Sequence, residues 1–413
     1  MEKRRVVITG MGMMTPLGKT QAETWESAVN GKSGIGPITQ FDASEFAAQI
    51  AGEVKGFEPQ DYLDKKEARR IDRFSQLAVA ASQEAWDDSG LSKDTYEMER
   101  FGCIIGSGVG GLKTLEDNYK VYAKSGPRKI SPFLIPGMLD NLAPGHISIR
   151  YGLKGVNFII SSACTSSAHA IGEAARMVSL GVQDAVMTGG TESTVTPLGI
   201  GGFAAMKALS TRNDDPQKAS RPFDEGRDGF ILSEGSVIFV LESLDAAKER
   251  GAKIYAEVLG YGVSSDASHI TAPSGVGAEY CMREAIKNAG LEINDIQYVN
   301  AHGTSTPVGD VMETKAIKGV FGDYAHNGLL VSSTKSMTGH LLGAAGAIEI
   351  GLCSLMLQNQ IVLPTINLEK PAAECDLDFV PQVARKAELK HILSNSFGFG
   401  GTNGSVVLGR VDA

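Results

Sequence analysis

The chain has 413 residues, 42% of them hydrophobic, which is enough to bury a large core in one big domain or two fused ones. Its net charge of −9 disfavours a general nucleic-acid-binding protein, and no apolar run approaches the roughly 20 residues of a membrane span. Five cysteines without paired spacing and an N-terminal stretch without a secretory signal predict a cytoplasmic protein with no disulfide framework.

The first part of the chain alternates strand-like and helical segments. A β-branched run at 4–12 predicts a strand, and apolar residues at helical spacing from Ile71 to Ala85 predict a helix that stops near Gly90. Further strands are predicted at 100–108 and 184–193, and an apolar run from Phe158 leads through small residues into a helix that begins near Thr165.

The second part repeats this order. The strand-like run at 252–262, the helical pattern at 279–291 and the strand-like run at 296–305 follow the same sequence of patterns. "VSSTKSMTGHLLGAAG" then matches "ISSACTSSAHAIGEA", so Lys335 occupies the position of Cys164. We therefore predict an α/β protein of two duplicated β/α halves, residues 1–250 and 251–413, with segments 112–150 and 191–235 as insertions.

Cys164 lies where an apolar strand gives way to small residues and then to a helix. This is the local arrangement of a nucleophile elbow, in which small neighbours leave room for a substrate carbonyl. The N-terminal end of a helix favours a thiolate, so we expect the pKa of Cys164 to fall from about 8.5 toward about 7. The other four cysteines lie in apolar or unremarkable contexts and are predicted to be structural.

Two of the seven histidines lie in glycine-rich turns. His302 follows a predicted strand in "YVNAHGTSTPVGD", and His340 precedes a helix-like run in "MTGHLLGAAG". Ligand sites of α/β proteins collect at strand ends, so we predict that both histidines share a site with Cys164.

Four motifs together, "SSACTSSAHAI", "NAHGTSTPVGD", "STKSMTGHLLGAAG" and "NSFGFGGTN", resemble the β-ketoacyl-[acyl-carrier-protein] synthases. The resemblance covers essentially the whole chain and implies the thiolase-like fold, a five-layered αβαβα sandwich. It also implies the reaction. Cys164 would take an acyl chain from a carrier protein, and the enolate formed by decarboxylation of malonyl-carrier would then attack the Cys164 thioester. His302 and His340 would donate to the enolate oxygen as neutral imidazoles.

The resemblance assigns supporting roles as well. Lys335 would pair with Glu349, Asp310 and Glu313 would support His302, and Phe399 would gate the malonyl pocket and supply an oxyanion N–H. The implied substrate-binding residues are Thr304, Thr306, Val109, Phe133 and Phe203.

The implied partner is an acidic acyl carrier protein, and family members are homodimers. A basic patch of Lys65, Lys66, Arg69, Arg70 and Lys207 is the predicted docking surface. No nucleic acid, membrane, metal or bound cofactor is expected, because the phosphopantetheine arrives on the carrier.

Several alternatives remain at this stage. "GSGVGG" at 106–111 satisfies the dinucleotide-binding pattern, but the acid expected about 20 residues later is missing. A thiolase would need a second cysteine near the C-terminal glycine turn, and priming enzymes pair histidine with asparagine. A chain-length-factor-like partner would lack the nucleophile. The chain resembles the type II elongating synthases more closely than the type I enzymes, and a polyketide ketosynthase remains an alternative.

Overall fold

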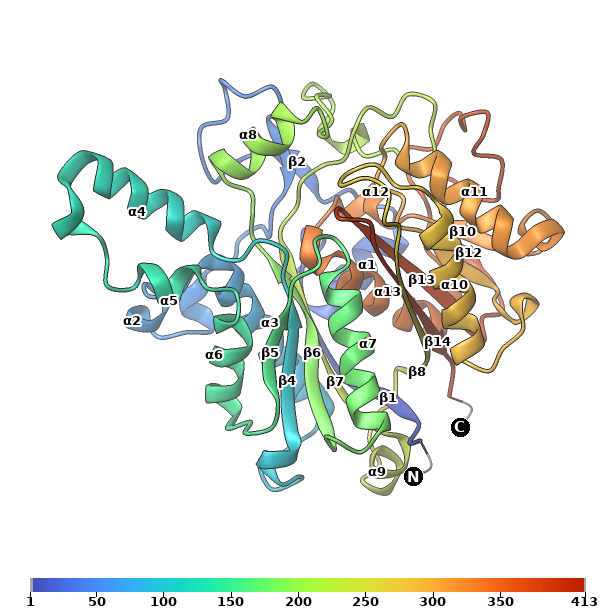
Figure 1. The fold of residues 1–413 in the computed structure, drawn as a ribbon, viewed down its shortest axis with the longest axis horizontal. Coiled ribbons are helices and arrows are strands. Elements are labelled where there is room, and N and C mark those ends of the chain that lie inside the picture. The colour runs from blue at the N-terminus through green and yellow to red at the C-terminus, as the bar shows by residue number, and fades with distance from the viewer. Residues whose placement is uncertain (1–2, 412–413) are drawn as a thin grey trace.

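One continuous sheet runs through the computed structural model, which describes residues 3–411 (Figure 1). Within those residues the sheet has ten strands in the order β5-β4-β6-β7-β1-β8-β14-β13-β9-β10. Its strands are β1 (Val6–Met14), β4 (Phe101–Gly106), β5 (Asn157–Ile160), β6 (Ala185–Glu192), β7 (Gly235–Ser243), β8 (Ala256–Ser265), β9 (Tyr298–Asn300), β10 (Leu330–Ser332), β13 (His391–Gly398) and β14 (Thr402–Gly409). Two small antiparallel pairs are β2 (Ile35–Pro37) with β3 (Ile50–Gly52) and β11 (Ile361–Val362) with β12 (Arg385–Lys386).

Helices cover both outer faces of the sheet and fill the space inside its bend. They are α1 (Gln21–Val29), α2 (Lys65–Ala68), α3 (Arg73–Ser89), α4 (Leu112–Ser125), α5 (Leu134–Met138), α6 (Leu142–Tyr151), α7 (Ser166–Ser179), α8 (Pro197–Ala205), α9 (Leu244–Glu249), α10 (Val276–Asn288), α11 (Gly309–Phe321), α12 (Lys335–Thr338) and α13 (Ala345–Asn359). Short 3₁₀ turns are η1 (Pro59–Asp61), η2 (Met98–Arg100), η3 (Pro127–Lys129), η4 (Pro216–Lys218), η5 (Ile293–Asp295), η6 (Gly322–Ala325) and η7 (Leu342–Ala344).

The sheet consists of two matching halves. The strand order β5-β4-β6-β7-β1 is repeated as β10-β9-β13-β14-β8, with the same pattern of parallel and antiparallel pairs. The halves meet where β1 pairs with β8 through Val7 with Glu257 and Ile8 with Ala256. The order of elements along the chain repeats too, since β1-α3-β4-β5-α7-β6-β7 matches β8-α10-β9-β10-α13-β13-β14. The predicted duplication is therefore present in the fold.

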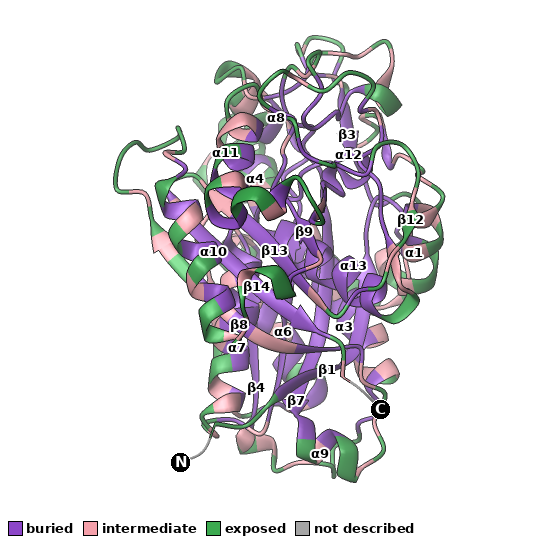
Figure 2. Cartoon of the chain, turned by 90° about the vertical axis from the view of Figure 1, so that its right-hand side faces the viewer, coloured by how far each residue is buried: buried purple, intermediate pink, exposed green. Residues whose placement is uncertain are grey.

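The layers follow from which helices pack on which strands. Helices α7 and α13 contact each other and strands of both half-sheets, so they form the middle layer. Helix α3 lies outside on β1 and β7, and α10 lies outside on β8 and β14. Figure 2 shows buried residues concentrated along the strands and α13, with exposed residues on the outer helices. The predicted five-layered αβαβα sandwich is confirmed.

A repeated glycine contact explains why the first strand of each half carries the pattern G-x-G. A Cβ on Gly12 of β1 would lie 2.0 Å from the Ala81 carbonyl oxygen of α3. A Cβ on Gly262 of β8 would lie 2.1 Å from the Cys281 carbonyl oxygen of α10. Only glycine permits this approach of helix to strand. The same packing device therefore operates in both halves.

Helix α3 shows how the local sequence sets an element's limits. The Asp72 carboxylate accepts from the Phe74 N–H and caps the helix, so Ile71, which the sequence predicts to be helical, lies before the helix begins. Gly90 ends the helix in the left-handed region, with φ 67°. Phe74 and Leu77 are fully buried between these limits, and burial of each contributes about 1.5–3 kcal/mol.

The interpretation of segment 112–150 as an insertion is only partly right. Helices α4 and α5 do project from the body of the molecule (Figure 1). Helix α6, however, packs on β4, β5 and α3, and it connects two parallel strands as α11 does between β9 and β10. Parallel neighbours need such a crossover, so α6 belongs to the duplicated framework and not to an insertion.

The carboxyl ends of both half-sheets carry the loops that hold the predicted site. Cys164 follows β5, His302 follows β9, Lys335 follows β10, and Phe399 follows β13. In the part of the chain that the structure describes, no helix is both long and apolar enough to cross a membrane.

Candidate active site

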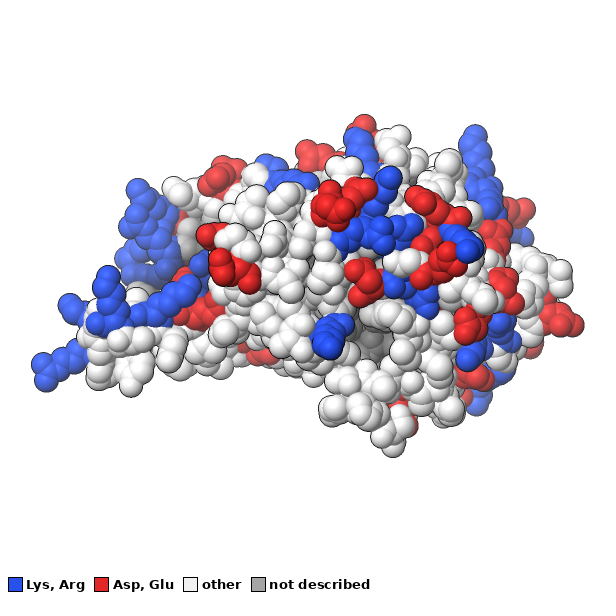
Figure 3. Space-filling view, turned by 90° about the horizontal axis from the view of Figure 1, so that it is seen from above, with Lys and Arg blue, Asp and Glu red and all other residues white. Residues whose placement is uncertain are grey.

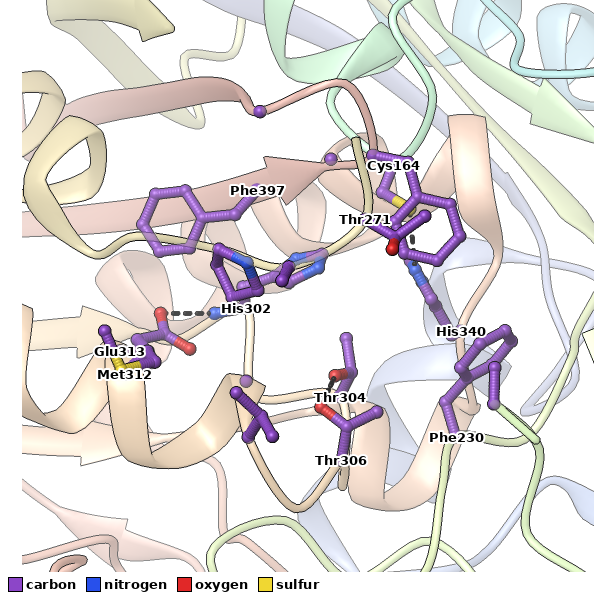
Figure 4. Close-up of a pocket in the computed structure, with 18 of the residues that line it drawn as sticks. Cys164, Phe230, Thr271, His302, Thr304, Thr306, Met312, Glu313, His340 and Phe397 are labelled. Carbon is purple, nitrogen blue, oxygen red and sulfur yellow. Dashed lines mark hydrogen bonds between the residues drawn. The ribbon is translucent and has the colours of Figure 1, made fainter. Parts of the chain in front are cut away.

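Cys164, His302 and His340 line one cavity of about 410 Å³ (Figure 4). This volume lies in the range of small-molecule sites. The loops that bring them together come from both halves of the sheet, Cys164 from the first half and the two histidines from the second. The sequence therefore identified three residues that the fold gathers in one place.

The three side chains lie within bonding reach of a common reacting centre. The Cys164 Sγ and His340 Nε2 are 3.1 Å apart, and ligand atoms of all three residues lie within 4.8 Å of one another. The two imidazole rings are nearly perpendicular, with centroids 5.3 Å apart. Figure 4 shows the sulfur directed toward His340, with His302 beside it. This geometry presents two imidazoles to any thioester that reaches the sulfur.

The sequence predicts a lowered pKa for Cys164, whereas the structure raises it. Cys164 is partly exposed to the cavity, yet burial of the thiol raises its pKa to about 11. The Lys335 charge and the backbone N–H groups of Phe399 and Cys164 lower this pKa but do not outweigh burial. The expectation of a helix-stabilised thiolate near pH 7 is wrong, because the cost of burying the anion exceeds the help of the helix end. In the resting protein Cys164 is therefore a thiol.

This protonation state predicts the pH dependence of alkylation. A thiol with a pKa near 11 reacts only through its small thiolate fraction. Below the pKa, this fraction increases about tenfold for each unit by which the pH is raised. We expect the rate of Cys164 alkylation by iodoacetamide to rise continuously from pH 7 to pH 9. Mass spectrometry of the modified peptide measures this rate, and a plateau near pH 7 would contradict the assigned direction.

Both histidines are neutral at neutral pH. Burial, and next the Lys335 charge, hold the pKa of each imidazole well below its usual value. The Lys335 Nζ lies 3.4 Å from the His302 Nδ1. An ammonium group has only donors, so Nδ1 accepts and the ring proton lies on Nε2. His302 therefore offers an N–H donor from its other nitrogen.

Lys335 is buried and forms an ion pair with Glu349 of α13. Burial raises the pKa of Glu349 to about 7, although the Lys335 charge and hydrogen bond act in the opposite direction. The pairing that the resemblance implies is thus present in the structure. Lys335 also faces His302. Glu349 of the middle-layer helix α13 therefore holds the ammonium group that orients the His302 imidazole.

Removing half of this ion pair should destabilise the fold. Lys335→Met leaves the Glu349 carboxyl buried without its partner, and we expect a loss of about 3–5 kcal/mol in the free energy of unfolding. The double variant Lys335→Met/Glu349→Leu should recover most of that loss, since both charges are replaced by apolar groups. Urea denaturation followed by circular dichroism measures both values. Equal stabilities of the single and double variants would contradict the pairing argument.

Glu313 and Asp310 support the His302 loop at two different points. The Glu313 carboxylate accepts from the backbone N–H groups of His302 at 2.8 Å and Gly303 at 2.7 Å. Asp310 instead accepts from the backbone N–H groups of Ser305 and Thr306 at 3.1 and 3.3 Å. Burial raises the pKa of Glu313 to about 7 and that of Asp310 to about 6. Glu313 therefore fixes His302 itself, and Asp310 fixes the turn that follows it.

The backbone of His340 is held by the segment that the sequence marked as the second insertion. His340 N–H donates to the Ile231 carbonyl at 2.8 Å, and Ser233 N–H donates to the His340 carbonyl at 3.0 Å. The Phe230 ring meets the His340 imidazole edge-on at 5.3 Å. Segment 191–235 therefore positions a site residue.

Thr304, Thr306 and Phe203, which the resemblance assigns to substrate binding, line the cavity. The two threonine hydroxyl groups are 3.1 Å apart (Figure 4), and Phe203 packs edge-on against Phe230 with centroids 5.4 Å apart. Phe399 also lines the cavity from the loop after β13, and its side chain is 36% exposed. Glycines flank it on both sides, so the loop that carries this ring has few packing restraints.

The remaining predicted residues lie elsewhere. Val109 and Phe133 do not line the cavity within the single chain. Phe133 instead borders a second hollow with Lys65, Lys66, Arg69 and Arg70, and the Arg70 guanidinium lies 4.6 Å from its ring centroid. Basic side chains gather at the end of the molecule formed by α2, α4 and α5, at the left of Figure 3. Lys207 is separate from them, exposed at the rim of the active-site cavity.

The sulfur and imidazole nitrogens are atoms of the kind that bind zinc. A zinc-bound histidine usually donates its other N–H to an acceptor. Here the ammonium of Lys335 faces the His302 Nδ1, and the His340 Nδ1 has no hydrogen-bond partner among the described residues. These surroundings do not fit a resident metal, and the absence of a metal cofactor stays a prediction.

Sequence reasoning missed part of the cavity wall. The loop between β8 and α10 contributes His269 and Thr271, and α11 contributes Met312. It also missed Glu192, a fully buried acid at the end of β6 whose charge raises the pKa of Cys164. The only signal for Glu192 was its place at a strand end after two glycines.

Comparisons with known proteins agree with this geometry. Models described as the β-ketoacyl synthase N-terminal and C-terminal domains match residues 3–247 and 255–369. The 3-oxoacyl-[acyl-carrier-protein] synthase 2 of Coxiella burnetii is 54% identical and that of Vibrio harveyi 51%, each over 100% of both chains. A solved ketosynthase bound to a hexaketide, in complex with its type II polyketide acyl-carrier protein, has a TM-score of 0.92 and 32% identity, covering 99% of this chain and 100% of that one. The chain belongs to the β-ketoacyl synthase family.

Proposed function

We propose that the protein is an elongating β-ketoacyl-[acyl-carrier-protein] synthase of type II fatty acid synthesis. It would condense an acyl chain held on Cys164 with malonyl-carrier, giving 3-oxoacyl-carrier and CO₂. The observation that carries this proposal is the thiol of Cys164 facing two neutral imidazoles across one cavity. Relatives at 54 and 51% identity, named for the same reaction, support it.

The first step moves the acyl group from the carrier to the protein. The Cys164 sulfur attacks the thioester carbonyl, its proton is transferred, and the carrier leaves as a free thiol. Backbone N–H groups of Cys164 and Phe399 face the sulfur, so they are placed to donate to the oxyanion that forms at the attacked carbonyl. His340 Nε2, 3.1 Å from the sulfur, is within reach to accept the thiol proton.

The second step forms the carbon–carbon bond when an enolate carbon attacks the carbonyl of the Cys164 thioester. The bond between the sulfur and the acyl carbon breaks, and the Cys164 sulfur leaves as a thiolate that is then protonated. Loss of CO₂ from malonyl-carrier leaves an enolate, and its negative charge develops on the thioester oxygen. The His302 Nε2–H donor is oriented by Lys335, and His340 would supply the second donor. No general base needs to remove a C–H proton, because the electrons of the departing carboxylate form the carbanion. Neutral imidazoles suit this task, since each keeps one ring N–H that can donate to the enolate oxygen.

The cavity wall suggests how the arm and the substrates are held. Thr304 and Thr306 present adjacent hydroxyl groups that suit the amides of phosphopantetheine. Phe399, with its glycine neighbours, would control access between Cys164 and the malonyl-binding part of the cavity. We propose no resident cofactor, because the carrier delivers the phosphopantetheine.

The proposed partner is an acidic acyl carrier protein that docks on the exposed basic side chains of Lys65, Lys66, Arg69 and Arg70, with Lys207 contributing separately at the rim of the active-site cavity. A related ketosynthase solved with its carrier supports such a complex. We also propose a homodimer, since Tyr119, Ile135 and other apolar side chains of α4 and α5 are exposed in the single chain. A cytoplasmic location suits five free cysteines.

Charge reversal should test the docking surface. For Lys66→Glu/Arg70→Glu we expect the KM for malonyl-carrier to rise about tenfold with a smaller change in kcat, because only the encounter is weakened. The wild-type KM should rise with ionic strength, and the variant should show less of this dependence. Lys287→Glu, an exposed charge on the outer helix α10, serves as the control. An unchanged KM in the double variant would remove these residues from the docking surface.

The experiment that tests the proposed function is a condensation assay. Carrier-bound acyl chains of graded length are mixed with malonyl-carrier, and the products are read by mass spectrometry. Extension of saturated chains by two carbons with release of CO₂ is the expected result. Repeated extension without reduction would favour a polyketide ketosynthase, and no extension of any chain would contradict the proposal.

A further inference from the structure

The glycine-rich turn after β4, Gly106–Gly111, has no role in the chemistry described so far. Its sequence GSGVGG is of the kind that cradles phosphate groups with successive backbone N–H donors. In this structure those donors already have an anion. The carboxylate of Glu192, at the end of the neighbouring strand β6, occupies the turn.

The contacts of Glu192 come from two separate segments. Its Oε2 accepts from the Gly108 N–H at 2.7 Å and the Gly343 N–H at 3.1 Å. Its Oε1 accepts from the Val109 N–H at 3.3 Å and the Ser107 hydroxyl at 3.4 Å. Glu192 itself is 0% exposed. An internal carboxylate therefore fills the space that a phosphate would take in a nucleotide-binding loop, which explains the pattern without a dinucleotide.

These partners require a carboxylate in particular. The backbone groups that face Glu192 are all donors, and an ionised carboxyl group has only acceptors. An amide in its place would turn an NH₂ group toward an N–H group. Burial raises the pKa of Glu192 to about 7, while the N–H groups of Gly108, Gly343, Val109 and Gly110 lower it. These N–H groups therefore offset part of the cost of burying the anion, although the pKa stays above its usual value.

The two segments that Glu192 joins are next to the reacting side chains. Gly108 packs against Ala163, the residue before Cys164, since a Cβ on Gly108 would lie 3.5 Å from the Ala163 carbonyl oxygen. Gly343 lies in η7, three residues after His340. The two glycines touch each other, because a Cβ on Gly343 would lie 2.2 Å from the Gly108 nitrogen. Glu192 therefore connects the backbone beside the nucleophile to the backbone beside the imidazole.

We propose that Glu192 is a positioning residue, a built-in anion that holds the loops of Cys164 and His340 at the separation needed for acyl transfer. We call this contact of the Glu192 carboxylate with the two loops the anion clamp. Its effect on acyl transfer rests on the proposed function, whereas the clamp itself does not. The clamp has an electrostatic consequence as well. Burial is the main reason why the pKa of Cys164 is raised, and the Glu192 charge adds to this effect by opposing thiolate formation.

The test replaces the side chain and then returns an anion. Glu192→Ala should slow acyl transfer from acyl-carrier to Cys164 about a hundredfold, the effect of a displacement near 1 Å between reacting groups. Sodium formate should restore the rate with saturation, because formate can occupy the vacated turn. Formamide, which has the same size but no charge, should not restore it. Glu257→Ala, which removes a buried carboxylate beside the exposed Arg5, is the control for loss of any buried acid.

A second readout does not depend on the substrate. In Glu192→Gln, loss of the charge should raise the alkylation rate of Cys164 at neutral pH about tenfold while acyl transfer falls. A simple loss of packing would not make formate differ from formamide. Equal rescue by both, no rescue by either in a variant with wild-type thermal unfolding, or near-normal acyl transfer in Glu192→Ala would overturn the clamp. If alkylation responds as expected but the wild-type protein accepts no acyl group, the clamp stands and the proposed function fails.

Discussion

Cys164→Ala is expected to abolish acyl transfer, lowering the rate by a factor on the order of 10⁴ or more. In the proposed function the sulfur forms the covalent intermediate, and no other cysteine lines the active-site cavity as the structure describes it. Incubation with radiolabelled acyl-carrier, followed by denaturation, measures the label that remains on the protein. Wild-type protein should retain one acyl group per chain, and the variant should retain none.

The matched control is Cys375→Ala, which removes a buried thiol from the core cluster around α10 and α11. This variant should be acylated normally, with only the modest loss of stability of a small core truncation. Stable label on the Cys164→Ala protein would place the nucleophile elsewhere and contradict the assignment.

His302→Ala is expected to separate the two half-reactions. Acylation of Cys164 should continue, because the oxyanion of that step faces the backbone N–H groups of Cys164 and Phe399. Condensation should fall by about 10²–10³, the usual effect of losing one oxyanion donor. Single-turnover mixing of the acylated protein with malonyl-carrier measures the second step alone.

His326→Ala, which changes an exposed histidine after η6, is the control and should behave as wild type. If acyl-His302→Ala protein condensed with malonyl-carrier at a near-normal rate, the assignment of two imidazole donors would be wrong. If acylation failed as well, the Lys335–His302 contact would be needed for the shape of the whole site rather than for one step.

The sequence predicted the fold well because its patterns are local and occur twice. Helix α3 ends at Gly90 through one left-handed residue, and α10 is followed by Gly290 with φ 70° in the same way. The role of α6 could not be predicted so easily. Its own pattern looks like any surface helix, and only the parallel pairing of β4 with β5 shows that a crossover must lie there.

The site was predictable where a motif surrounds a reactive residue, as at Cys164, His302 and His340. The pKa of Cys164 was not, because the cost of burial depends on the atoms that pack around the sulfur and not on neighbours in sequence. Glu192 was missed for a similar reason. Its partners at Gly108 and Gly343 are 84 and 151 residues away along the chain, and only the folded backbone brings their N–H groups to one carboxylate.

The place of β14 in the sheet has a consequence for biosynthesis. This last described strand lies between β13 and β8, in the interior of the sheet and not at an edge. While a ribosome is still translating residues 402–409, neither β8 nor β13 has its β14 partner. The nascent chain therefore carries Cys164 without a complete sheet around its site until β14 has been added.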